Sequence, residues 1–191
     1  SQGLPTAVTL ATKDKKDFDN ISKLIPNKEF RIYYSNDLIG TQIGGSLKNI
    51  YAIAAGIAEG LNLGENAKSA LISRSFAEMT RYAKKFKADK NTLFGLSGLG
   101  DLILTCSSTN SRNTQFGIKL ASSKYDNFLD LLQSQEVTEG YYTVKAVYNI
   151  SKKNKIDMPI MESVYNILYK QHDLKEELSN LLNRPITDEK I

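Results

Sequence analysis

The spacing of apolar positions along the chain changes near residue 36. Before that point, 7–11 is rich in β-branched residues and 30–34 alternates between apolar and polar residues, which predicts two strands. Between them, the apolar residues of 17–25 recur at helical spacing and stop at Pro26, so a helix is expected there. Strand, helix and strand form one βαβ-like unit, which is too small to bury both faces of a sheet by itself.

From residue 37 onward the apolar spacing is helical throughout. One helix of about 25 residues is predicted from 37 to 61, and its other faces carry small residues, so we expect it to be central and closely surrounded. Further helices are predicted near 66–86, 91–95, 101–106, 112–121, 126–134, 142–154, 159–170 and 174–183. The predicted fold class is therefore mainly α, with an α/β segment at 1–35 and an all-helical domain at 36–191.

Composition places the chain among ordinary globular proteins. Of its 191 residues, 41% are hydrophobic and 24% charged, which excludes a disordered or fibrous chain. The net charge of +4 is small and mixed in sign, so it fits an anionic small ligand as well as a weak nucleic-acid surface. No apolar stretch approaches the roughly 18 residues that would span a bilayer, so no membrane span is expected.

The cysteine content and the first residue add two expectations. Cys106 is the sole cysteine, which excludes an intrachain disulfide and a cysteine-based zinc site. We therefore expect a protein of the reducing cytoplasm with no metal site. The chain begins with Ser1 and shows no signal-peptide pattern, so we interpret it as a fragment that starts inside a longer protein.

Three polar segments interrupt the apolar pattern, and the first is Lys48. It lies among small residues near the middle of the long predicted helix. A lysine that is partly desolvated there would be suited to proton transfer. The alternative is a lysine that extends along its stem into solvent.

The second segment, 95–101, is rich in glycine and leads to Asp101 at the start of an apolar helix. It is not the dinucleotide-binding fingerprint, and a simple explanation is a glycine loop with Asp101 as the helix cap. The third segment, 108–113, opens another helix with Ser111, Arg112 and Asn113. Backbone amides at a helix start beside an arginine are suited to an anion such as phosphate, and a serine cap with a solvated arginine is the equal alternative.

Two reactive residue types are not assigned to chemistry. His172 is the sole histidine and follows the end of a predicted helix, where a surface residue or a partner of the helix dipole is expected. Cys106 follows an apolar run and is expected to be packed rather than nucleophilic.

Taken together, these segments resemble bacterial NAD(P)-dependent glycerol-3-phosphate dehydrogenases. The similarity is carried, in the family's order, by 3–7, 47–57, 63–68, 98–106, 111–117 and 137–140. The family's Gly-rich phosphate loop and its Gly-Pro-Ser segment do not occur in this sequence. The resemblance therefore implies the end of a Rossmann domain followed by a helical substrate domain like the C-terminal domain of 6-phosphogluconate dehydrogenase. One departure is Tyr141-Tyr142, where a smaller or basic residue is expected.

The resemblance implies a role for individual residues. Lys48 would be the general acid/base, taking the proton from the secondary hydroxyl of glycerol 3-phosphate as hydride leaves to nicotinamide, and returning it when dihydroxyacetone phosphate is reduced. The implied substrate contacts are Lys48, Asp101, Ser111, Arg112 and Asn113, and the implied contacts to NAD or NADP are Arg112, Val137 and Glu139.

The resemblance also implies partners and leaves alternatives. The partners are a small phosphorylated substrate and a nicotinamide dinucleotide, in a protein that feeds glycerophospholipid synthesis; a homodimer is compatible with it, and a nucleic-acid partner is not expected. Without the Gly-rich loop, the chain alone is expected to be inactive. Two alternatives stay open: a related dehydrogenase of a hydroxy acid or of 6-phosphogluconate, and a non-catalytic basic helical binding module.

Overall fold

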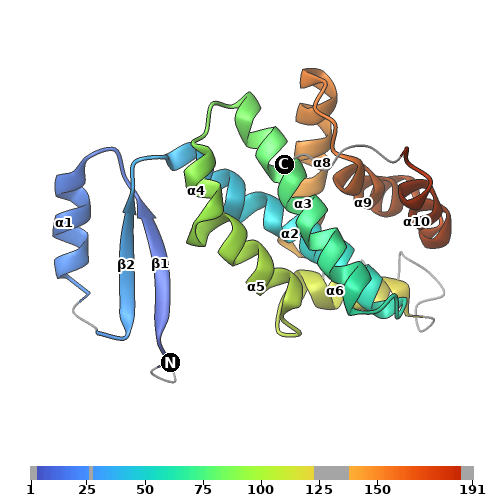
Figure 1. The fold of residues 1–191 in the computed structure, drawn as a ribbon, viewed down its shortest axis with the longest axis horizontal. Coiled ribbons are helices and arrows are strands. Elements are labelled where there is room, and N and C mark those ends of the chain that lie inside the picture. Colours follow the sequence, from blue (N-terminus) through green and yellow to red (C-terminus); the bar gives the residue numbers. More distant parts are fainter. Residues whose placement is uncertain (1–3, 26–27, 123–137, 186–191) are drawn as a thin grey trace.

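The computed structural model describes residues 4–25, 28–122 and 138–185 (Figure 1). Its first part is a two-stranded parallel sheet of β1 (Thr6–Ala11) and β2 (Phe30–Ser35), with α1 (Lys15–Lys23) as the connection between the strands. The helix packs on the sheet through Phe18 and Tyr34, whose ring centroids lie 5.3 Å apart. The predicted strand–helix–strand unit is confirmed, and it forms the left end of the molecule in Figure 1.

The rest of the described chain is helical, which confirms the predicted fold class. The helices are α2 (Leu38–Gly60), α3 (Glu65–Lys85), α4 (Lys90–Phe94), the π-helical turn η1 (Leu96–Gly100), α5 (Asp101–Ser107), α6 (Arg112–Ala121), α8 (Glu139–Asn154), α9 (Pro159–Lys170) and α10 (Leu174–Leu182). The helix predicted at 126–134 lies outside the described residues. The prediction of a glycine loop in the segment 95–101 is wrong, because residues 96–100 form η1, which runs directly into α5.

The long helix α2 is central, and three glycines let its neighbours approach it backbone to backbone. A Cβ atom built on Gly44 would lie 1.9 Å from the carbonyl oxygen of Ser97 in η1. At the crossing with α6, a Cβ on Gly56 would lie 2.0 Å from the carbonyl oxygen of Thr114, and one on Gly117 would lie 2.2 Å from that of Ile53. The small residues of α2 therefore serve close packing, as the sequence predicts.

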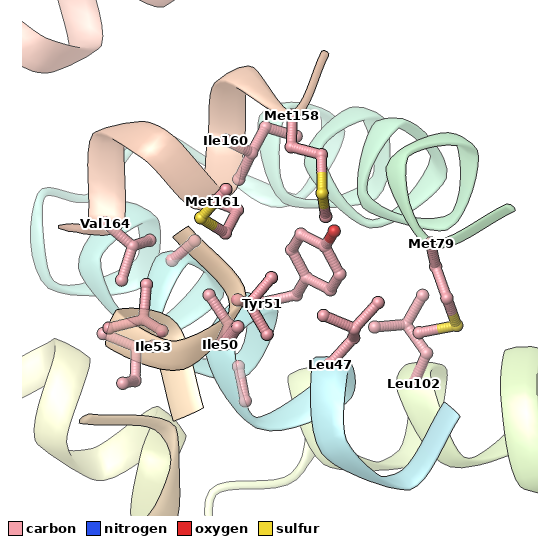
Figure 2. Packing of buried hydrophobic residues seen from close by; sticks show 14 of the residues in the cluster. Leu47, Ile50, Tyr51, Ile53, Met79, Leu102, Met158, Ile160, Met161 and Val164 are labelled. Carbon is pink, nitrogen blue, oxygen red and sulfur yellow. The ribbon is translucent and has the colours of Figure 1, made fainter. Parts of the chain in front are cut away.

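The core is built around the remaining faces of α2. Figure 2 shows the side chains of α2 facing those of α9, with side chains of α3 and α5 beside them. These residues are buried, so the apolar pattern that predicts the helices also identifies the residues that pack between them. The labelled residues are Leu47, Ile50, Tyr51 and Ile53 of α2, Met79 of α3, Leu102 of α5, and Met158, Ile160, Met161 and Val164 at α9.

A buried carboxylate in this core caps a helix that belongs to another part of the sequence. Glu78 of α3 accepts hydrogen bonds from the backbone N–H groups of Ile160 (2.6 Å) and Met161 (3.1 Å) in the first turn of α9. The N-cap residue Met158 has no side chain that could do so. Burial raises the pKa of Glu78 to about 7, while the two N–H donors favour its ionised form.

Neither Cys106 nor His172 was assigned to chemistry from the sequence, and the structure places one in the core and the other between two helices. Cys106 is buried and burial raises the pKa of its thiol to about 12, so the prediction of a packed residue is confirmed. Nδ1 of His172, just after α9, lies 2.7 Å from Oε1 of the buried Glu177 in α10. His172 therefore links two helices.

Two further features concern the described residues as a whole. None of their helices combines the length and apolar character that crossing a bilayer requires. Within the same residues, no group of three or more His, Cys, Asp or Glu side chains is placed to hold a metal ion.

Candidate active site

Lys48 forms an ion pair that joins the central helix to α5. Its Nζ atom lies 2.6 Å from Oδ2 of Asp101, and the side chains are 23% and 30% exposed. One interpretation of the sequence was a lysine that extends into solvent, and the ion pair with Asp101 contradicts it. The pair is partly desolvated yet remains open to a ligand, which is a suitable setting for a proton donor and acceptor.

Asp101 does not cap α5, which corrects one interpretation of the sequence. Because η1 continues into α5, Asp101 already has helical backbone angles (φ −71°, ψ −32°), and its side chain makes no capping hydrogen bond. Oγ1 of Thr105 donates to the backbone carbonyl oxygen of Asp101 at 2.6 Å and lies 3.4 Å from its Oδ1. The other carboxylate oxygen, Oδ2, faces Lys48.

Of the two roles that the sequence left open for the polar segment before α6, the structure shows the serine cap. Ser111 is the N-cap, and its side chain accepts the N–H of Thr114 at 3.3 Å. Arg112, the next residue, pairs with Oε1 of Glu139 and is 75% exposed. The serine cap is thus present, and beside it lies an exposed guanidinium that could exchange a carboxylate for a phosphate.

Asn113 is buried, and both ends of its side-chain amide are used within the protein. Oδ1 accepts the backbone N–H of Gly140 at 2.9 Å, and Nδ2 donates to Oδ1 of Asn49 at 3.1 Å. Asn113 therefore ties the first turn of α6 to the first turn of α8 and to α2. In this arrangement it positions its neighbours.

Asn49 is a further polar residue of this region, and it is not among the site residues predicted from the sequence. This residue follows Lys48 in α2 and is only partly buried. A signal was present, since an amide adjacent to a lysine interrupts an otherwise apolar helix. Through Asn113, Asn49 connects the Lys48 pair with the beginning of α8.

The predicted cofactor contacts lie partly in the described chain. Glu139 is the first residue of α8 and pairs with Arg112, whereas Val137 lies outside the described residues. The departure at Tyr141-Tyr142 has a structural explanation for the first tyrosine. The ring of Tyr141 stacks on Tyr169 of α9 with centroids 4.8 Å apart, so Tyr141 packs between two helices.

A cleft lies between the sheet and the helical part of the chain, and none of the predicted site residues lines it. It has a volume of about 490 Å³ and separates the sheet from α4 and η1. Its lining includes Thr9, Tyr34, Asn91 and Ser97. The candidate site is instead made of the Lys48–Asp101 ion pair and the exposed Arg112, whose neighbours in the sequence, Asn49 and Asn113, hydrogen-bond to each other.

The fold and sequence match known proteins. The family model for the C-terminus of NAD-dependent glycerol-3-phosphate dehydrogenase matches residues 37–179. Glycerol-3-phosphate dehydrogenase [NAD(P)+] of Solidesulfovibrio magneticus is 46% identical over 187 residues, which is 97% of this chain and 56% of that protein. The corresponding protein of Colwellia psychrerythraea is 43% identical over 185 residues, or 96% and 55% of the two chains. The chain thus spans about half the length of the curated relatives it matches.

Solved structures agree with this match. The crystal structure of glycerol-3-phosphate dehydrogenase from Coxiella burnetii superposes with a TM-score of 0.89 at 39% identity, covering 95% of this chain and 56% of that one. The Plasmodium falciparum glycerol-3-phosphate dehydrogenase structure gives 0.84 at 26% identity, covering 97% and 54%. The resemblance stated from the sequence is confirmed, and the chain belongs to the glycerol-3-phosphate dehydrogenase family, of which it carries the C-terminal domain.

Proposed function

We propose that this chain is the substrate-binding and catalytic half of an NAD(P)-linked dehydrogenase that interconverts sn-glycerol 3-phosphate and dihydroxyacetone phosphate. The observation that carries the proposal is the Lys48–Asp101 pair, with 2.6 Å between Nζ and Oδ2 and both side chains partly exposed. The exposed Arg112 is linked to it through Asn113 and Asn49, which hydrogen-bond to each other. The names of the relatives support the choice of substrate. The proposed setting is glycerophospholipid synthesis in the cytoplasm, for which a single buried cysteine is suitable.

Lys48 is the proposed general acid/base. Oxidation of a secondary alcohol removes a proton from oxygen and a hydride from carbon, and bound nicotinamide supplies the hydride acceptor. Lys48 in its neutral form takes the hydroxyl proton and becomes an ammonium, which the Asp101 carboxylate 2.6 Å away stabilises. In the reverse direction the ammonium returns the proton to the developing alkoxide.

Arg112 is the proposed ligand of the substrate phosphate. It begins α6, where backbone N–H groups and the helix dipole also favour an anion. Because its present partner Glu139 is 52% exposed, the exchange of that carboxylate for a phosphate requires no buried charge to be left unpaired. Asn113 keeps α6 in place for this contact.

We also assign Arg112 to the binding of an anionic dinucleotide, since a guanidinium at a helix start is suited to its phosphates. The family resemblance assigns Glu139 and Val137 to the same cofactor, and Val137 lies outside the described residues. No Gly-x-Gly-x-x-Gly sequence occurs in the chain, so the pyrophosphate needs residues beyond these 191. The choice between NAD and NADP depends on the same residues.

We also propose a domain boundary next to Asp37, between a dinucleotide-domain segment at 1–35 and the helical domain at 36–191. Asp37 fixes this junction, because Oδ1 accepts the N–H of Gly40 in α2 and Oδ2 accepts the N–H of Asp89 before α4, both at 2.8 Å. A homodimer remains a prediction.

The proposal is tested by joining this chain to a complete dinucleotide-binding domain and following NAD(P)H formation. We expect turnover of sn-glycerol 3-phosphate, none by the chain alone, and none of unphosphorylated glycerol. A preference for 6-phosphogluconate or for carboxylated alcohols would favour the related dehydrogenases instead. Steeply salt-dependent binding of an oligonucleotide would favour a basic binding module.

A further inference from the structure

Gly45 is a glycine in the middle of a helix with no packing reason to be one. Apart from its chain neighbours and the nearby backbone of α2, a Cβ atom built on it would meet no atom within 4 Å, whereas one on its neighbour Gly44 would lie 1.9 Å from a backbone oxygen of η1. Gly64 is also unobstructed, but its φ of +86° explains that glycine. Glycine within a helix destabilises it by about 1 kcal/mol relative to alanine. Gly45 therefore lowers the stability of α2, and no close contact in the structure requires a glycine at this position.

Gly45 lies one helical turn before Lys48 and Asn49, the two polar side chains that α2 contributes to the candidate active site. Lys48 and Asn49 follow it by three and four residues, so they lie one turn further along the same face of α2. Side chains on a helix lean toward its N-terminus, which directs both of them over Gly45. The hydrogen bond from Nδ2 of Asn49 to the carbonyl oxygen of Gly45, at 3.4 Å, agrees with this direction.

We infer that Gly45 is a specificity-determining position, whose missing side chain makes room for the three-carbon chain of the polyol phosphate beside Lys48. The inference rests on the proposed function, since it assumes that the reacting hydroxyl approaches Nζ of Lys48. The carbon that bears this hydroxyl must then lie next to the lysine side chain. The unobstructed face at Gly45, flanked by Lys48 and Asn49, is where the structure leaves space for it.

The test compares two ligands that share a phosphate but differ in the carbon chain. In the 191-residue chain, sn-glycerol 3-phosphate and inorganic phosphate are titrated against wild type and Gly45→Ala, with binding followed by NMR. We expect Gly45→Ala to weaken binding of glycerol 3-phosphate by about 10- to 100-fold and to leave phosphate binding within about twofold. The same substitution should raise Tm by about 2–4 °C, because it removes a helix glycine without a clash.

Ser46→Ala is the matched control. Ser46 is the next residue, exposed on another face of α2, and its replacement also raises helix propensity. It should raise Tm without changing either affinity. Equal affinity of wild type and Gly45→Ala for glycerol 3-phosphate would overturn the inference and leave the proposed function standing, as would an equal loss for both ligands. Failure of the wild-type chain to bind glycerol 3-phosphate would overturn both.

Discussion

Nζ of Lys48 in α2 lies 2.6 Å from Oδ2 of Asp101 in α5, although 53 residues separate them in the sequence. If this pair performs proton transfer, Lys48→Ala in the enzyme with a complete dinucleotide domain should lower kcat by about 10²–10⁴-fold. Asp101→Asn keeps the shape but removes the charge, and should lower kcat by about 10- to 100-fold. Since both groups are partly exposed, neither change should alter the free energy of unfolding by more than about 1 kcal/mol. A normal kcat in Lys48→Ala, with only a raised KM, would reassign the lysine to binding.

Arg112→Ala should act on affinity. Removing the exposed guanidinium should raise KM for the phosphorylated substrate by about 10- to 100-fold, with a smaller effect on kcat. Arg112→Lys should restore only part of this, because an ammonium cannot make the two parallel contacts of a guanidinium. The pair with Glu139 is exposed, so urea unfolding of both variants should match wild type within about 0.5 kcal/mol. An unchanged KM in Arg112→Ala would remove this residue from the phosphate site.

Asn113→Ala should be costly to stability as well as to activity. The substitution leaves the buried backbone N–H of Gly140 without its partner and removes the hydrogen bond to Oδ1 of the partly buried Asn49. We expect the free energy of unfolding to fall by about 2–3 kcal/mol. The control is Ser111→Ala, which loses a helix cap and should cost about 1 kcal/mol. Equal losses in both variants, measured by urea unfolding, would contradict the positioning role of Asn113.

Gly117→Ala should destabilise the crossing of α2 and α6. The added Cβ would lie 2.2 Å from the carbonyl oxygen of Ile53, and only backbone movement can relieve that overlap. A loss of about 3 kcal/mol or more is expected, measurable as a lower midpoint of urea unfolding. A variant as stable as wild type would show that the two helices do not approach so closely.

Glu78 should make the stability of the protein decrease as pH rises. Its pKa is about 7 in the folded protein against 4.5 as the ordinary value, so the folded state retains a proton that the unfolded state releases between these pH values. The contribution of Glu78 is therefore complete below pH 4.5 and is lost as pH rises through 7, by about 3 kcal/mol. The measurement is urea unfolding of wild type and Glu78→Gln from pH 4 to 8. The wild-type advantage should shrink across this range, and a growing advantage would mean that the N–H donors of α9 outweigh burial.

The periodicity of apolar residues was sufficient to predict where the helices lie in the sequence, but not which residues contact one another between helices. The spacing of apolar residues identifies α2 and α3 within two residues of their observed ends. It does not show that α2 is buried on every side over residues 50–58, or that the buried residues of α3 all lie between Ser75 and Ala83. The turn η1 was missed since its glycines carry no apolar pattern, and with it the reason why Asp101 does not cap α5. The partners of Glu78 lie 82 and 83 residues away, and only the assembled fold brings them together.

For the candidate site too, the sequence predicts some features and only the assembled fold shows the others. Residue types and the family resemblance identify Lys48, Asp101 and Arg112, whose charged groups have an evident chemical use. They do not distinguish Asn113, whose side chain is enclosed, from Arg112, which is exposed, because both are polar residues at one helix start. Burial depends on α2 and α8, which approach α6 from distant parts of the chain.

The backbone crossings of α2 also restrict how this chain can change in length. Gly44 meets η1 and Gly56 meets α6, and Lys48 must point toward Asp101 between them. Inserting or deleting a single residue between the two glycines would rotate one part of the helix against the other by about 100°. At least one glycine would then be replaced at its crossing by a residue with a side chain, or the lysine would turn away from its carboxylate. Insertions and deletions should therefore be confined to the connections between helices.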